Sequence, residues 1–331
     1  MKTWKKVGLT ALAGSLVAFG SANAEWSVSG SGKITYTDDG NVGTGNSGNN
    51  NVDGDRWGIA RDFSVSASTE LDMGWTVTAT HAMSAGAADA SSLAIDMGAM
   101  GTLKYTGHDG TFGLEVIDDI VPTAHEEVTD GLGVGGGVGS GASGWNYNNS
   151  LGDGMITVDI GVTSKASNTS TGNGTGGASG GTSGPSGQSI ALKLAPIDGL
   201  AVYYGTGEYM DAACASTQDD HETVGLVYTY GPVSVGYQTT ELDDQGSGNT
   251  DIDREMMSIS YAVNDELSIS YGETTADWST QTADEEATGF SASYTMGAMT
   301  ITLHRNSQDN DNGNTLKNEI EHTELALSFS F

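Results

Sequence analysis

The last nine residues of the chain, 323–331, read TELALSFSF. Large apolar side chains recur there at every second position, namely Leu325, Leu327, Phe329 and Phe331. A period of two is typical of a strand with one apolar face and one polar face. In a soluble protein, such an apolar strand with nothing to cover it would promote aggregation. We therefore expect its apolar face to meet lipid and both of its edges to be paired in a closed barrel.

The first 24 residues form a separate segment. Lys2, Lys5 and Lys6 precede an apolar run over residues 7–20, which is too short to cross a bilayer as a helix. The sequence ANA at residues 22–24 then matches a small-residue cleavage site. The segment predicts a cleaved secretory signal, with residues 25–331 as a single transmembrane β-barrel domain. A retained membrane anchor is the alternative.

The charge of the chain excludes one class of partner. The sequence holds 12 Lys and Arg against 43 Asp and Glu, a formal net charge of −31. An acidic surface of this kind does not bind nucleic acid, and it attracts cations. The single cysteine, Cys214, permits no disulfide within an exported chain.

Alternating segments like the last one recur along the whole chain, separated in turn by tight turns and by long polar loops. Counting them predicts 16 strands, eight long loops and seven tight turns. An even number of strands, with short turns on one side and long loops on the other, is typical of an outer-membrane barrel. The sequence thus predicts an all-β fold, a 16-stranded antiparallel up-and-down transmembrane barrel. A soluble β-sandwich is the alternative, but Thr, Ser and Gly would line its inner face.

Three details of this pattern lead to further expectations. Arg61 shares the phase of its strand's apolar residues, so either a bulge resets the register or the side chain reaches the headgroups. A short polar segment near residues 87–90 is expected to separate two strands. The longest interruption, the third loop at about 108–144, is acidic in its first part and rich in Gly, Val and Ser in its second.

The chain resembles the general-diffusion porins of Gram-negative bacteria, of the alphaproteobacterial type. The residues that carry the resemblance are the end of the signal at 22–24, the first strand at 25–36, the turn at 98–103 and the last strand at 325–331. It implies an outer-membrane barrel of 16 strands, usually trimeric, whose third loop folds inward and narrows the pore. It also implies that the assembly machinery of the outer membrane recognises the terminal strand through Leu325, Leu327, Phe329 and Phe331.

The chemistry of such a pore depends on its radius and its charge. The third loop offers acidic residues for a constriction: Asp109, Glu115, Asp118, Asp119, Glu126 and Glu127. Four basic residues fall on the polar phase of their strands and are expected on the pore wall: Lys33, Lys104, Lys193 and Arg254. Our hypothesis is that these cations face the loop carboxylates across the narrowest section. Alternatively, the acids belong to a solvated loop and the lysines line a wide vestibule.

These features predict passive diffusion of small hydrophilic solutes and ions, with a preference for cations, and no enzymatic activity. The alternatives are a porin selective for one nutrient, a barrel enzyme for which His81 is the best candidate residue, and an adhesin. No cofactor is expected, although the acidic loops offer oxygen ligands to Ca²⁺ or Mg²⁺. Residues 308–319 partly match the residue spacing of a calcium-binding loop. Expected partners are membrane lipid, lipopolysaccharide and two further copies of the chain.

Overall fold

A computed structural model of the chain describes residues 24–40, 54–84, 87–108, 113–138, 144–163, 187–209, 219–244, 250–315 and 319–331. The predicted signal up to residue 23 and Cys214 lie outside these ranges. Sixteen strands are present: β1 (Glu25–Gly40), β2 (Gly54–Glu70), β3 (Thr76–Ser84), β4 (Ala87–Asp96), β5 (Thr102–His108), β6 (Gly144–Leu151), β7 (Ile156–Thr163), β8 (Gly187–Ile197), β9 (Leu200–Tyr209), β10 (Asp219–Tyr230), β11 (Val233–Asp243), β12 (Ile252–Ala262), β13 (Leu267–Trp278), β14 (Glu285–Met296), β15 (Met299–Asp309) and β16 (Ile320–Ser330). Three short 3₁₀ helices accompany them in the described ranges: η1 (Gly98–Met100), η2 (Gly113–Ile117) and η3 (Asp311–Gly313).

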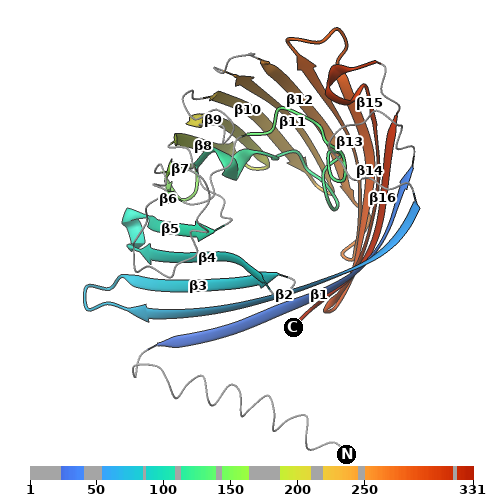
Figure 1. Ribbon diagram of the computed structural model, residues 1–331. Helices are drawn as coiled ribbons and strands as arrows, with labels where there is room; N and C mark the ends of the chain where they lie inside the picture. The colour runs from blue at the N-terminus through green and yellow to red at the C-terminus, as the bar shows by residue number, and fades with distance from the viewer. Residues whose placement is uncertain are drawn as a thin grey trace, which may run out of the picture.

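The strands close into one antiparallel barrel, as the sequence predicts. Each strand pairs with its neighbours in the chain, and β1 pairs with β16 to complete the ring (Figure 1). At this closure Tyr36 lies opposite Leu325, and the backbone N–H of Phe331 donates to the carbonyl of Gly30 over 2.8 Å. The terminal strand therefore has both edges paired, which leaves no open edge to aggregate.

The distribution of side chains is the reverse of that in a soluble protein. Apolar residues of one phase point outward and remain accessible; Ile59, for example, is 67% exposed. Polar residues of the other phase are buried inside, and His304 is 0% exposed. This arrangement excludes the β-sandwich, because the large apolar rows do not meet one another in a dry interior. Such an outer surface requires lipid around it. No helix within the described ranges has the length and hydropathy to span a membrane.

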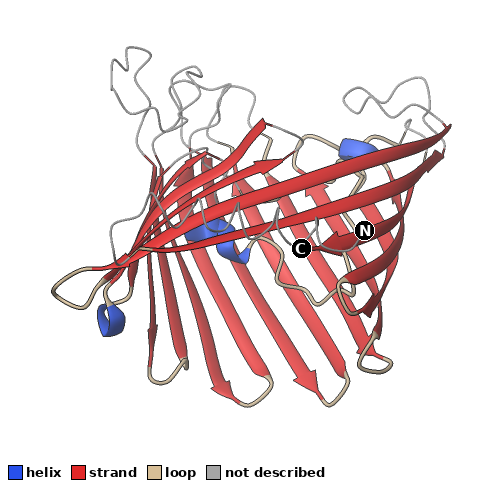
Figure 2. Ribbon diagram, turned by 90° about the horizontal axis from the view of Figure 1, so that it is seen from below, coloured by secondary structure: helices blue, strands red, loops and turns tan. Residues whose placement is uncertain are grey.

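Seven tight turns gather at one end of the barrel (Figure 2). Several depend on glycine; Gly199, for example, has a φ of +77°, and a Cβ there would lie 2.3 Å from the carbonyl oxygen of Thr229. A side chain at this position would meet both backbone strain and a clash.

Two expectations about individual segments need correction or refinement. Residues 87–90 do not separate two strands but begin β4, because the β3–β4 ladder continues there across a register shift between His81 and Met83. The register of β1 with β2 is unbroken at Arg61, so no bulge turns this side chain inward. Arg61 stays exposed on the outer face.

Candidate functional site

The third loop connects β5 to β6, and its described part, residues 113–138, runs along the inside of the barrel wall (Figure 1, green). Its backbone N–H groups donate to polar side chains of the wall: Gly113 to Asn146, Leu114 to Ser189, Ile120 to Gln238, Ala124 to Ser270 and His125 to Ser291, over 2.9 to 3.1 Å. These acceptors come from β6, β8, β11, β13 and β14. The polar inner face of the barrel thus takes up the backbone hydrogen bonds of an irregular segment, as buried backbone requires.

Glycines on the inner wall give the loop its close approach. A Cβ at Gly205 would lie 2.2 Å from Leu114, and one at Gly225 would lie 2.2 Å from Ile120. We call the wall glycines that contact apolar loop residues the glycine seats: Gly205, Gly225, Gly236, Gly272 and Gly289. Because they lack side chains, loop residues such as Leu114, which is 0% exposed, pack directly onto the wall backbone.

Gln238 holds the loop where its path leaves η2. This residue of β11 is 1% exposed, and its Oε1 accepts from the Ile120 N–H over 3.0 Å. Its Nε2 donates to the carbonyl of Ile117 over 2.8 Å. One side chain therefore satisfies a donor and an acceptor of the loop backbone. Sequence reasoning missed Gln238, because nothing local distinguishes it from other polar residues on inward positions.

Arg254 does not stand at an open pore wall as the sequence suggests. It is 5% exposed, and its Nη2 lies 3.0 Å from Oδ1 of Asp119. The loop covers Arg254, because a Cβ added at Gly136 of the loop would lie 2.9 Å from the Cβ of Arg254. Arg254 is thus a buried anchor that neutralises part of the loop's charge, rather than a cation facing that charge across the lumen.

Asp118 is the second acid at this anchor. Its Oδ1 accepts from the backbone N–H of Val138 over 2.9 Å, which ties the loop just after η2 to its last described residue. Burial of the carboxyl, and then the charge of Asp119, raise its pKa above the ordinary value, while the Val138 N–H and Arg254 oppose the rise. Burial also raises the pKa of Glu127, with the charges of Asp119, Glu126 and Asp130 adding to it.

The remaining predicted acids are dispersed along the loop. Asp119 is exposed, Glu126 is half-buried, Glu115 is half-buried on η2, and Asp109 lies outside the described residues. Asp130, which the sequence did not single out, lies farther along the loop and is 3.2 Å from Nε2 of His304.

The three lysines occupy different parts of the inner wall. Lys33 on β1 has its Nζ 3.7 Å from Oε1 of Glu324, and Lys104 is half-buried on β5. Lys193 lies toward the short turns, with its Nζ 5.7 Å from the centre of the Tyr203 ring. Within the described residues, Arg254 alone of the four predicted cations forms an ion pair with a loop carboxylate.

The two remaining candidates from the sequence have other surroundings. Within residues 308–319, the side chain of Gln308 and the backbone N–H of Asn312 both donate to Glu285. His81 lies on the outer face opposite Val65 and is exposed there. Neither placement adds a catalytic group to the lumen.

Comparisons with known proteins agree with this architecture. The family model described as Gram-negative porin matches residues 8–330. No curated protein sequence matches the chain. Among solved structures, a loop L8 deletion mutant of OmpT from Vibrio cholerae has a TM-score of 0.67 at 13% identity, with 93% of this chain and 100% of that chain covered. A mutant of the Rhodobacter blastica porin gives a TM-score of 0.64 at 14% identity with the same coverage.

A third solved structure is described as an anion-selective porin from Comamonas acidovorans, with a TM-score of 0.66 at 10% identity over 93% of this chain and 100% of that chain. Identities this low establish the shared fold alone. The family model spans nearly the whole sequence, and the strand count, closure and apolar outer surface agree with it. The chain therefore belongs to the Gram-negative porins, the channel-forming β-barrels of the outer membrane.

Proposed function

We propose that this porin is a channel for passive diffusion of small hydrophilic solutes and ions that prefers cations. The observation that carries the proposal is the charge of the third loop. Residues 113–138 contain six Asp and Glu and neither Lys nor Arg. The wall cation that reaches this loop, Arg254, is buried and already paired. The free charge of the loop is therefore negative, which raises the local concentration of cations.

Lysines on strands to which the loop is not hydrogen-bonded supply positive charge to the lumen in this proposal. Lys33 and Lys104 lie on β1 and β5, whereas the loop is bonded along β6 to β15. We propose that the loop acids, the exposed Asp119 and the half-buried Glu126, and these lysines orient dipolar solutes between them. Lys33 is partly neutralised by Glu324, so the acidic side prevails.

Charge preference needs a direct test, because the fold alone does not determine it; one protein of similar fold is described as anion-selective. We further propose homotrimers that contact lipid and lipopolysaccharide and are inserted by the outer-membrane assembly machinery through the terminal strand. A nutrient-selective channel is the second candidate for function. It would show saturable conductance for one solute, whereas a general pore would not.

We expect Glu126→Gln/Glu127→Gln to reduce the cation preference. A unit charge about 4 Å from a passing ion is worth about 1 kcal/mol in water, roughly a fivefold change in local ion concentration. Reversal potentials in a KCl gradient across a planar bilayer measure the effect. The control is Asp72→Asn, an exposed carboxylate in the β2–β3 turn. A wild-type reversal potential of the sign that anions produce would refute the proposal, as would one that the double variant leaves unchanged.

The cation preference should also weaken on acidification, starting above the ordinary carboxyl pKa of about 4. Asp118 and Glu127 have raised pKa values, so they lose their charges before the other acids. Because these groups bind protons more tightly when the loop is docked, docking is strengthened at low pH and weakens as pH rises through the raised pKa values. Reversal potentials measured between pH 7 and pH 3 would report the protonation of both carboxyls. The variant Asp118→Asn/Glu127→Gln should lack the part of the change that occurs at the higher pH values. Identical curves would show that neither group senses the lumen.

A further inference from the structure

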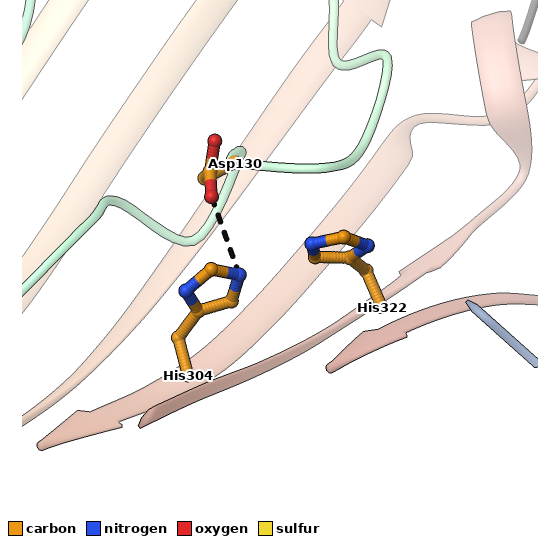
Figure 3. A group of neighbouring side chains, drawn as sticks. All are labelled: Asp130, His304 and His322. Carbon is orange, nitrogen blue, oxygen red and sulfur yellow. Dashed lines mark ion pairs between the residues drawn. The ribbon is translucent and has the colours of Figure 1, made fainter. Parts of the chain in front are cut away.

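Two histidines of the wall and one acid of the third loop converge where the loop crosses β15 and β16 (Figure 3). His304 lies on β15 and His322 on β16, with ring centres 5.1 Å apart and nearly parallel planes. Oδ2 of Asp130 lies 3.2 Å from Nε2 of His304. One ligand atom from each of the three residues lies within 4.8 Å of the others.

The hydrogen bonding of this cluster is incomplete. His304 is 0% exposed, its Nδ1 has no hydrogen-bond partner among the described residues, and its Nε2 has the Asp130 carboxylate 3.2 Å away without the geometry of a hydrogen bond. Leaving such groups unpaired in a buried place is unfavourable, because they lose their hydrogen bonds to water without replacement. The stacked rings also bring two imidazoles together without a donor and acceptor between them. A group that both imidazoles could bind would remove this deficit.

The second histidine is already oriented for such a role. Nδ1 of His322 lies 2.6 Å from Oδ1 of Asp39, and Arg56 donates to the other oxygen of that carboxylate. With Nδ1–H donating to Asp39, the lone pair of Nε2 is free to bind. A carboxylate behind a histidine in this way fixes the tautomer of metal-binding histidines and raises their basicity.

We propose that His304, His322 and Asp130 form a binding site for a divalent transition-metal ion of the Zn²⁺ class. Donors around a tetrahedral Zn²⁺ at 2.0–2.1 Å are about 3.3 Å apart, so the present group needs to contract by about 1.5 Å at most. Asp130 is 40% exposed at its side chain, which leaves a coordination position open to water from the lumen.

The donor set determines which ions fit. Two imidazoles and one carboxylate favour Zn²⁺, Co²⁺, Ni²⁺ or Cu²⁺, whereas Ca²⁺ and Mg²⁺ prefer oxygen ligands alone. A further imidazole, that of His125, has its ring centre 5.7 Å from that of His304. Its Nε2 is also buried without a hydrogen-bond partner in the part of the chain that the structure describes.

The loop is shaped to bring its ligand to the wall. Gly131, next to Asp130, has a φ of +72°, and a Cβ there would lie 2.1 Å from Cδ2 of His322. Only glycine lets the loop cover this imidazole so closely. Since two ligands belong to the barrel and one to the loop, a bound ion would fasten the far half of the loop to β15 and β16. This role is separate from solute transport.

Metal binding to the full barrel, purified in detergent and stripped of metal, tests the proposal. Titration with Zn²⁺ should show one ion bound per chain, and Co²⁺ should give the intense visible bands of a tetrahedral site. His304→Ala and His322→Ala should each weaken Zn²⁺ binding at least tenfold. Two controls should bind as the wild type does: His81→Ala on the outer face and His221→Ala on the inner wall of β10.

A loop variant separates loss of binding from loss of folding. Asp130→Asn changes no barrel residue, so the barrel should keep its resistance to SDS at room temperature while Zn²⁺ binding weakens. The proposal fails if Asp130→Asn binds Zn²⁺ as tightly as the wild type. It also fails if the three site variants match the controls, or if millimolar Ca²⁺ displaces Zn²⁺ from the wild type.

Discussion

Replacing Arg254 by alanine is expected to free the first half of the third loop from the wall and leave the barrel closed. In the wild type this guanidinium lies between β12 and the loop, 3.0 Å from Asp119 and close to Asp118. Its removal leaves two adjacent carboxylates at the wall, the half-buried Asp118 and the exposed Asp119, with no compensating charge. Breaking a fully buried ion pair from one side costs about 3–5 kcal/mol, and the exposure of Asp119 places the penalty for this pair below that range. That penalty falls on docking of the loop, because the barrel ladder does not involve this side chain.

Limited proteolysis of the loop and single-channel noise would both report its release. The matched control is Arg305→Ala, which breaks a pair of 2.9 Å with Glu321 on an exposed surface and should cost at most about 1 kcal/mol. Adding Asp118→Asn and Asp119→Asn to Arg254→Ala should restore much of the protection, since it removes the repulsion. If Arg254→Ala is no more sensitive to protease than Arg305→Ala, the anchor lies elsewhere.

The fold could be predicted from sequence because the strands of a membrane barrel show a local alternation of apolar and polar residues. The alternation in residues 323–331 fixes which side chains face lipid, and the pairing of that strand with β1 and β15 follows from closure. Turn residues then mark the reversals, as at Gly199. The pattern failed at residues 87–90, where small residues carry no apolar signal but the backbone ladder still continues.

The site was less predictable, because its contacts join positions far apart in sequence. The acidic character of the third loop is visible in the sequence, but its hydrogen bond to Gln238 spans more than a hundred residues. Phase alone placed Arg254 on the inner wall correctly and could not show that the loop would cover it. The same limit hid the pairing of His304 with His322, which depends on the register of β15 with β16.

The glycine seats lead to a second prediction of large effect. We expect Gly225→Leu to push the middle of the third loop into the lumen, since the first added atom would already lie 2.2 Å from Cδ1 of Ile120. Overfilling a packed contact costs about 1–3 kcal/mol. The loop has fewer backbone bonds to lose than a strand paired on both sides, so the loop should move. Single-channel conductance should then fall, with more flicker between levels.

Two further variants decide whether the seat itself is responsible. Gly32→Leu places the same side chain on a strand glycine of the outer face, where the nearest neighbour of a Cβ is 3.9 Å away, and conductance should stay at the wild-type value. Gly225→Leu/Ile120→Ala moves bulk from the loop to the wall, so conductance should return toward the wild type. If the double variant conducts as poorly as Gly225→Leu alone, the strand has deformed and the loop has not moved. Recovery in the double variant would instead show that the wall glycines set the distance of the loop from the pore axis. The double variant adds side-chain volume on the wall and removes a similar volume from the loop at the same contact.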